Sequence, residues 1–198
     1  EPVTQATLRI VKVFWGLDSS LAYRRHFPAI NWLTSYSLYV DTLAKWYNEQ
    51  FGPEYMINRD KAMHILQEEN ELQEIVRLVG QDALVGKAAR GAGDQLTLEV
   101  ARMVREDFLQ QNAFVDEDAY SSYDKQFELM RMILTFDTLG RDALGKGADM
   151  KALFAIGAKE RIGRAKMAAP DTYKAEYASI LEQMKNEIDA VIAGGEDA

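Results

Sequence analysis

Apolar residues recur at every third or fourth position from about residue 34 onward, and this spacing constrains the fold more than any other feature of the chain. Such a period places apolar side chains along one stripe of an α-helix, which is stable only when buried against other helices. A polar loop over 116–123 and a glycine-rich break over 140–147 interrupt the pattern. We therefore predict a mainly α fold, a helical bundle, with helices over 34–51, 58–79, 96–111, 124–139, two short ones across 150–166, and 171–191.

The N-terminal segment differs in being rich in β-branched and aromatic residues. Residues 4–15 predict a strand that ends at Gly16, and Asp18 is placed to cap a short helix that ends near Arg25. Because a lone strand leaves its backbone groups unpaired, we expect this one to belong to a sheet whose other strands lie outside the sequence. The chain begins with Glu1 rather than Met, which we interpret as a sign that it is part of a longer protein.

Charge and composition narrow the classes of function. Hydrophobic residues make up 47% and charged residues 27% of 198 residues, which is typical of a globular domain. The net charge of -8, with acidic and basic residues intermixed, argues against a nucleic-acid partner. The chain has no cysteine, which excludes disulfides and thiolate metal sites. It contains no apolar run near the roughly 20 residues of a membrane span and no visible signal peptide.

Two stretches imitate a phosphate-binding loop and are rejected. Residues 140–146 have the spacing G-x-x-x-x-G-K, but Gly147 stands where the motif needs Ser or Thr, and a helix rather than a strand precedes it. Residues 80–87 are one position too long. The two histidines, His26 and His64, lack further ligands at metal-binding spacing. We predict no catalytic residue and no metal site in this chain.

The densest concentration of side-chain chemistry lies in residues 24–37. Pro28 restricts its own backbone and that of Phe27, so the Phe27 ring is held on a stiff segment that could support a flat ligand. The residue types alone favour a loop that fills the core with apolar side chains. That second interpretation would bury Phe27, Ile30, Trp32 and Leu33.

A family resemblance favours the interpretation in which Phe27 contacts a ligand over the one in which it fills the core. The segment Pro28-Ala29-Ile30-Asn31, followed after three residues by Ser35-Tyr36-Ser37, resembles the signature of the nucleotide-binding subunits of rotary ATPases. The residues around it, 11–18 and 24–27, are most similar to the catalytic A subunit of V-type and archaeal-type ATP synthases. Leu38 and Tyr39, where the non-catalytic subunit type carries an arginine finger nearby, agree with this. The resemblance implies that 1–35 end a nucleotide-binding domain and 36–198 form the C-terminal helical bundle domain.

By this resemblance, the chain supplies an adenine pocket. In the family, the aromatic residue before the signature proline packs on the adenine ring, and the end of a long helix forms the second wall. The base would then lie between Phe27 and Phe114, and stacking on aromatic rings is worth about 1–3 kcal/mol per base. Phe114 could instead fill the core. The full set of adenine-binding candidates is Phe27, Gln111, Asn112, Ala113, Phe114 and Tyr120.

The resemblance also assigns what lies outside the chain. The phosphate loop and the Mg²⁺ ligands would precede it, with an arginine finger from a neighbouring subunit, so ATP or ADP with Mg²⁺ would bind the intact enzyme and none is expected on this chain alone. The partners would be the B subunits and the central stalk, on the cytoplasmic face of the membrane. The coupling ion, the direction of the reaction and the roles of Arg24 and Arg25 stay open. By position, the glycine-rich segment 82–93, called the tip below, resembles the loop that contacts the central stalk in the family. The candidate stalk contacts in it are Asp82, Leu84, Val85, Lys87 and Arg90.

A second hypothesis is a helical protein-interaction module without a nucleotide role. In that case the aromatic residues would matter only for stability, and the tip would be the functional surface. A strand, phosphate loop and helix upstream of Glu1 would favour the ATPase.

Overall fold

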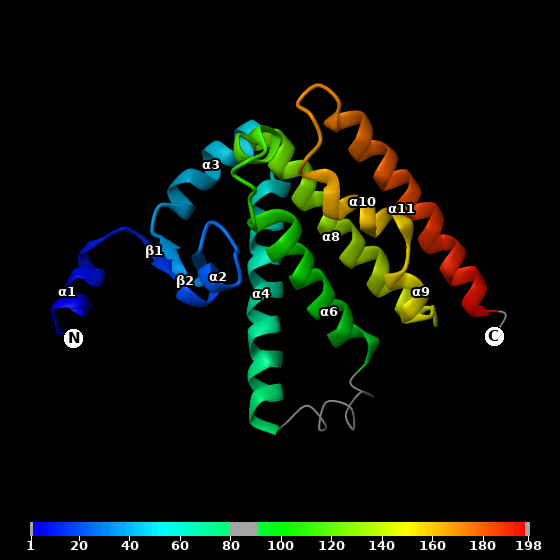
Figure 1. The fold of residues 1–198 in the computed structure, drawn as a ribbon, viewed down its shortest axis with the longest axis horizontal. Helices are drawn as coiled ribbons and strands as arrows, with labels where there is room; N and C mark the ends of the chain where they lie inside the picture. The colour runs from blue at the N-terminus through cyan, green and yellow to red at the C-terminus, as the bar shows by residue number, and fades with distance from the viewer. Residues whose placement is uncertain (1, 80–90, 197–198) are drawn as a thin grey trace.

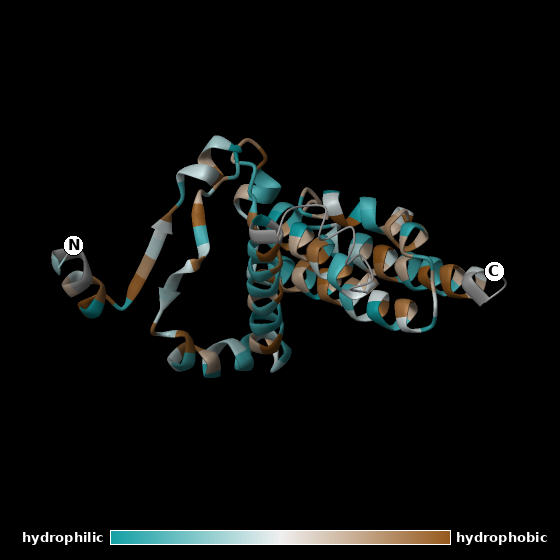
Figure 2. Cartoon of the chain, turned by 90° about the horizontal axis from the view of Figure 1, so that it is seen from below, coloured by the Kyte–Doolittle hydropathy of each residue, from teal (hydrophilic) through white to brown (hydrophobic). Residues whose placement is uncertain are grey.

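The computed structural model describes residues 2–79 and 91–196. A long helix, α4 (Glu54–Val79), separates a small N-terminal hairpin from a bundle of helices (Figures 1 and 2). The predicted mainly α fold with a short N-terminal β segment is therefore confirmed. The other elements are α1 (Pro2–Ile10), β1 (Val13–Leu17), α2 (Ser19–Tyr23), β2 (Ile30–Ser37), α3 (Val40–Phe51), α6 (Ala92–Met103), the π-helix η1 (Val104–Leu109), α7 (Asp116–Ala119), α8 (Tyr123–Gly145), α9 (Met150–Phe154), α10 (Gly157–Ala165) and α11 (Tyr173–Glu196).

The core of the bundle lies between α6 and α8. Helix α6 packs against both α4 and α8, and α11 covers α8 together with α10. The apolar stripe of α6 is completely buried, and it meets large side chains of α8 that are equally inaccessible. Burying each such side chain stabilises the fold by about 1.5–3 kcal/mol. Fully buried examples from the two helices are Leu96, Val100, Met103, Met132 and Phe136.

The predicted break over 140–147 is wrong, because α8 continues to Gly145. A Cβ on Gly140 would lie 3.2 Å from Leu96 Cδ2. This glycine therefore marks close packing of α8 on α6 and does not end the helix. The helix ends where Gly147 adopts a positive φ of 86°. The stretch that imitates a phosphate loop is thus mostly helical.

Several other boundaries also differ from the prediction. Helix α4 begins at Glu54, ahead of the expected residue 58. The single helix expected over 96–111 is α6 followed by the π-helical turn η1. The acidic segment 116–123 includes the short helix α7. The two short helices expected across 150–166 are confirmed as α9 and α10.

The hairpin corrects the interpretation of the N-terminal segment. Residues 4–10 lie in α1, and only Val13–Leu17 form a strand, which pairs antiparallel with β2. Residues 34–37, expected to begin a helix, belong to β2 instead. The strand therefore has a partner within this chain. The Tyr36 ring stacks on Phe14 with centroids 5.8 Å apart, and the Tyr36 hydroxyl donates to the Leu8 carbonyl at 2.8 Å.

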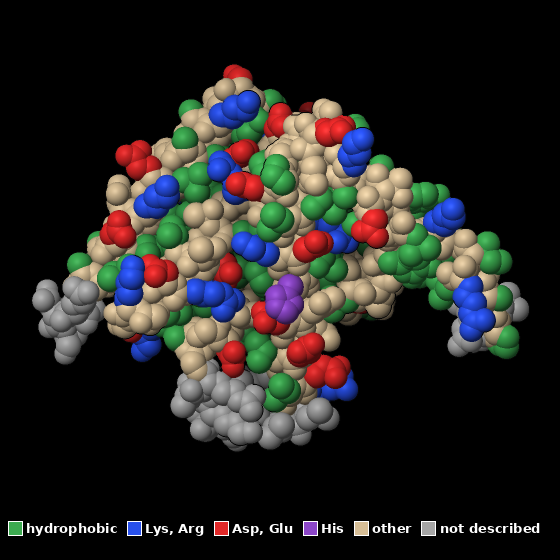
Figure 3. Space-filling model, turned by 180° about the vertical axis from the view of Figure 1, so that it is seen from behind, with side chains coloured by type: hydrophobic (Ala, Val, Ile, Leu, Met, Phe, Trp, Pro, Cys, Tyr) green, Lys and Arg blue, Asp and Glu red, His purple; other side chains and the backbone are tan. Residues whose placement is uncertain are grey.

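Surface charge is mixed. Figure 3 shows acidic and basic side chains interspersed on the face turned away from the view of Figure 1. Among the described helices, none is long and apolar enough to cross a membrane. Within the same part of the chain, no group of three or more His, Cys, Asp or Glu could hold a metal ion.

Candidate functional site

The signature residues Asn31 and Ser35 lie in β2 and hold the irregular part of the strand pair in shape. Asn31 Oδ1 accepts from the backbone N–H groups of Leu33 and Thr34, both at 3.0 Å. The Ser35 hydroxyl donates to the Asn31 carbonyl and accepts from the Gly16 N–H at 3.0 Å. These bonds satisfy backbone groups at the irregularity between Phe14 and Gly16. The polar signature residues thus fix the irregular part of β2 and its junction with β1.

Asp18 joins the two ends of this loop. Its carboxylate caps α2 by accepting from the Ser20 N–H at 2.8 Å, and it also accepts from Asn31 Nδ2 at 3.0 Å. Hydrogen bonds from Ser20 and then Asn31 lower the pKa of Asp18 below its ordinary value. The helix cap expected at Asp18 is therefore confirmed.

His26 and Phe27 lie in different environments. The His26 side chain is buried, with Nε2 2.9 Å from the Arg105 carbonyl and its ring centroid 5.6 Å from that of Trp32. Phe27, the next residue, is 52% exposed. The chain turns just before them, at Arg25, whose φ is 58°. His26 thus anchors the loop to η1, and Phe27 stays accessible.

The predicted second wall of the site begins beside Phe27. The Gln111 N–H donates to the Phe27 carbonyl at 2.7 Å, and Gln110 Nε2 donates to the Arg25 carbonyl at 3.4 Å. Lys166 Nζ fixes the end of η1 by donating to the Gln110 carbonyl at 2.7 Å. Segments more than 80 residues apart in sequence therefore lie side by side, as the resemblance implied for this region.

The remaining predicted adenine residues lie on the loop that follows. Asp118 is buried and its carboxylate accepts from the Asn112 N–H at 2.6 Å, while the Phe114 N–H donates to Asn112 Oδ1 at 3.0 Å. The Phe114 ring is 98% exposed, and Tyr120 is also exposed. Among the described residues, the rings of Phe27 and Phe114 make no direct ring contact. Neither ring fills the core, so the core-filling alternative is wrong for both.

The structure adds residues that the sequence did not single out. Arg105 donates through Nε and Nη2 to the Glu69 carboxylate at 3.0 and 2.8 Å. The two side chains are 18% and 7% exposed. The pair joins η1 to α4 through the same arginine whose carbonyl contacts His26. Because 36 residues separate Glu69 from Arg105, no helical spacing could have indicated the pair.

The remaining residues singled out from the sequence are the candidate stalk contacts and the two arginines, Arg24 and Arg25. The candidate stalk contacts, Asp82, Leu84, Val85, Lys87 and Arg90, lie outside the described residues. Arg24 Nε donates to the Ser20 carbonyl at 3.3 Å, which is a local structural bond. Arg25 contributes its carbonyl to the contact with Gln110.

Comparison with known proteins assigns the family. Residues 44–151 match the model described as the C-terminal domain of V and A type ATP synthase. The chain belongs to this family. Residues 1–37 match the model of the ATP synthase alpha/beta family, nucleotide-binding domain. Residues 38–43, where the hairpin passes into the helices, separate the two matches, and both matches confirm the resemblance drawn from the signature.

Individual proteins with similar sequences support the same family assignment. The chain is 52% identical over 193 residues to the V-type ATP synthase alpha chain of Acetivibrio thermocellus, covering 98% of this chain and 32% of that protein. It is 50% identical over 187 residues to the A subunit of the A-type ATP synthase of Methanosphaera stadtmanae, covering 94% of this chain and 31% of that protein. The chain therefore spans about a third of the length of these relatives.

Proposed function

We propose that this chain forms the adenine side of the nucleotide site in the catalytic A subunit of a V/A-type ATP synthase and passes nucleotide-driven motion to the central stalk. In this proposal residues 1–35 end the nucleotide-binding domain, and 36–198 form the helical domain. The proposal rests above all on the hydrogen bond from the Gln111 N–H to the Phe27 carbonyl at 2.7 Å. That bond supports the proposal because it joins the segment that carries Phe27 to the chain that follows η1.

The exposed aromatic rings of Phe27 and Phe114 are available to stack on a purine base. Phe27 is 52% and Phe114 98% exposed, so both can give up contact with water when a flat base packs on them. Offset stacking on an aromatic ring favours a base by about 1–3 kcal/mol. The amide groups of Gln111 and Asn112 can meet the polar edge of the base. Such a site binds the base and leaves the phosphates to residues outside this chain.

The contacts beside the site provide a path for motion. His26 contacts the Arg105 carbonyl, and the Arg105 guanidinium binds Glu69 on α4. From Glu69, helix α4 continues for ten residues, about 15 Å, to Val79, and the segment that carries the candidate stalk residues follows in the sequence. A rotation of the hairpin would therefore be carried along a rigid helix to the far end of the bundle.

The whole enzyme would use ATP or ADP with Mg²⁺ and would assemble with B subunits and stalk subunits on the cytoplasmic face of a membrane. The phosphate loop, the Mg²⁺ ligands and the water-orienting carboxylate would come from residues outside this chain, and an arginine finger from a neighbouring subunit. This chain would supply binding of the base and the coupling of that binding to movement.

The adenine assignment is tested by ATP hydrolysis in the assembled enzyme. Phe27→Ala and Phe114→Ala each remove one stacking surface, so the KM for ATP is expected to rise about 5- to 100-fold while kcat changes less. Phe154→Ala, on α9 outside the proposed pocket, is the control for general loss of packing. Unchanged KM values for both Phe27→Ala and Phe114→Ala would contradict the assignment.

A further inference from the structure

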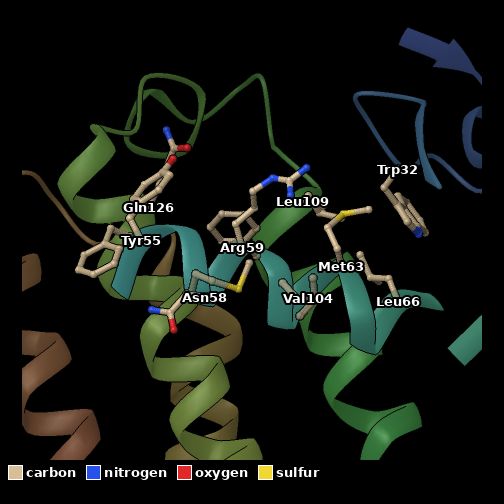
Figure 4. A pocket seen from close by; sticks show the side chains of 13 residues that line it. Trp32, Tyr55, Asn58, Arg59, Met63, Leu66, Val104, Leu109 and Gln126 are labelled. Atoms are coloured by element: carbon tan, nitrogen blue, oxygen red, sulfur yellow. The ribbon is translucent and has the colours of Figure 1, made fainter. Parts of the chain in front are cut away.

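A separate cavity lies between the hairpin and the bundle. It has a volume of about 260 Å³ and is lined by β2, α4, η1 and α8 (Figure 4). Most of its wall is apolar, with aromatic rings and two flexible thioethers. The volume is just below the roughly 300–1,000 Å³ of typical small-molecule sites. The principal apolar wall residues are Trp32, Met63, Phe108, Phe127 and Met130.

One polar group in the wall has no partner. Asn58 Nδ2 is buried without a hydrogen-bond partner in the described part of the chain. Two of the other polar side chains in the wall are engaged: Gln126 Nε2 donates to the Ser121 carbonyl at 2.9 Å, and Arg59 binds Asp60 at 2.7 Å while 44% of its side chain stays exposed. A buried donor that has lost water without gaining an acceptor is stabilised when a ligand oxygen accepts from it.

The cavity is distinct from the proposed adenine site, since neither Phe27 nor Phe114 lines it. Trp32 forms one end and also borders a second, smaller cavity of about 160 Å³ that is lined by Glu69 and Arg105 among others. Trp32 therefore stands between two cavities where β2 meets the bundle. A ligand in the larger cavity would contact the hairpin and the bundle at once.

We propose that this cavity binds a small aromatic carboxylate of about two fused rings. The rings would lie among the aromatic side chains and the thioethers of Met63 and Met130, which favour contact with aromatic rings. The carboxylate would accept a hydrogen bond from Asn58 Nδ2, and a bond to a charged acceptor is stronger than one to a neutral acceptor. Figure 4 shows Asn58 and Arg59 projecting from α4 in different directions, so that Asn58 rather than Arg59 is the donor assigned to the carboxylate.

Binding is tested with 2-naphthoate on the full-length subunit carrying ¹³C-labelled methionine methyl groups. At roughly 0.3 kcal/mol per heavy atom, this ligand should bind with a dissociation constant of about 1 mM or tighter. The methyl signals of Met63 and Met130 should shift on titration, and that of Met184, which is buried on α11, should not. Binding should persist in Phe27→Ala, so the test does not depend on the adenine proposal.

The role of the amide is tested by Asn58→Leu. This variant removes a donor that has no partner, so it is expected to fold at least as stably as the parent chain and to bind 2-naphthoate about tenfold more weakly. Asn186→Leu, the same change on α11, should leave the affinity unchanged. The proposal is overturned if Met63 and Met130 do not respond to about 10 mM probe, if ATP displaces the probe, or if both leucine variants bind equally well.

Discussion

The buried pair Glu69–Arg105 offers the sharpest test of how η1 is held against α4. Glu69 accepts two hydrogen bonds from Arg105, at 2.8 and 3.0 Å, and a third from Gln73 Nε2 at 2.9 Å. Glu69→Ala leaves the Arg105 guanidinium without its counter-ion in a site where its side chain is 18% exposed. Loss of one partner of a fully buried pair costs about 3–5 kcal/mol, and the partial exposure of Arg105 lowers our expectation to about 2–4 kcal/mol.

A double-mutant cycle separates the pair from other effects of the substitutions. Urea unfolding of Glu69→Ala, Arg105→Ala and the double variant should give a coupling free energy of about 1.5–3 kcal/mol. The exposed pair Arg164–Glu160, whose side chains are 79% and 70% exposed, is the control, and its coupling should stay near 0.5 kcal/mol or below. A coupling for Glu69–Arg105 no larger than that of the control would refute the claim that this pair fastens η1 to α4.

Three further predictions concern stability. Lys125 is 2% exposed and donates to three carbonyls at 2.7 Å. Lys125→Met should therefore cost about 2–4 kcal/mol in urea unfolding, because three buried acceptors lose their donor. Burial raises the pKa of Asp107 to about 6. The Asp107 carboxyl therefore ionises at a lower pH in the unfolded chain than in the folded one, so it lowers the free energy of unfolding as pH rises from about 4 to above 6. Asp107→Asn should stabilise the protein by about 1–3 kcal/mol at pH 8 but little at pH 4. An equal effect at both pH values would contradict this. Gly140→Ala should destabilise the protein by about 1–3 kcal/mol, because the added methyl group would press on Leu96. Gly145→Ala, whose methyl group would have nothing within 4 Å, should be neutral or stabilising in thermal melts. Equal effects of the two variants would show that the close packing at Gly140 is unimportant.

The helical bundle is predictable from the sequence, because apolar residues spaced three or four positions apart indicate which face of each helix is buried. The stripes of α6 and α8 are apolar at the positions that face the core, so the helices and their need for partners can be inferred together. The break predicted at Gly140 is wrong, because a glycine required for close helix packing looks in sequence like one that ends a helix. Only the position of Leu96 across the interface distinguishes the two cases.

The hairpin is less predictable, because strand pairing depends on residues far apart in the chain. The apolar spacing that continues into α3 begins at Tyr36, so residues 34–37 look like the start of that helix. Their assignment to β2 is decided by pairing with β1. The expected strand over 4–15 is too long for the same reason. Only the part that finds a partner, Val13–Leu17, is a strand.

The candidate site is predictable where a signature exists and unpredictable elsewhere. The signature around Pro28 singles out Phe27, and the family resemblance places Gln111 close by, which agrees with the hydrogen bond between them. The contact of His26 with the Arg105 carbonyl joins residues 79 positions apart. Long-range polar contacts of this kind leave no period in the sequence, so only the folded chain reveals them.

The central claim is that two distant aromatic residues enclose the same base, and an experimental structure of the assembled enzyme with ADP bound tests it most directly. The account predicts the adenine ring between Phe27 and Phe114, with each phenyl ring about 3.5–4 Å from it. An adenine ring held by other residues, with Phe27 and Phe114 both in contact with solvent or with protein only, would contradict it.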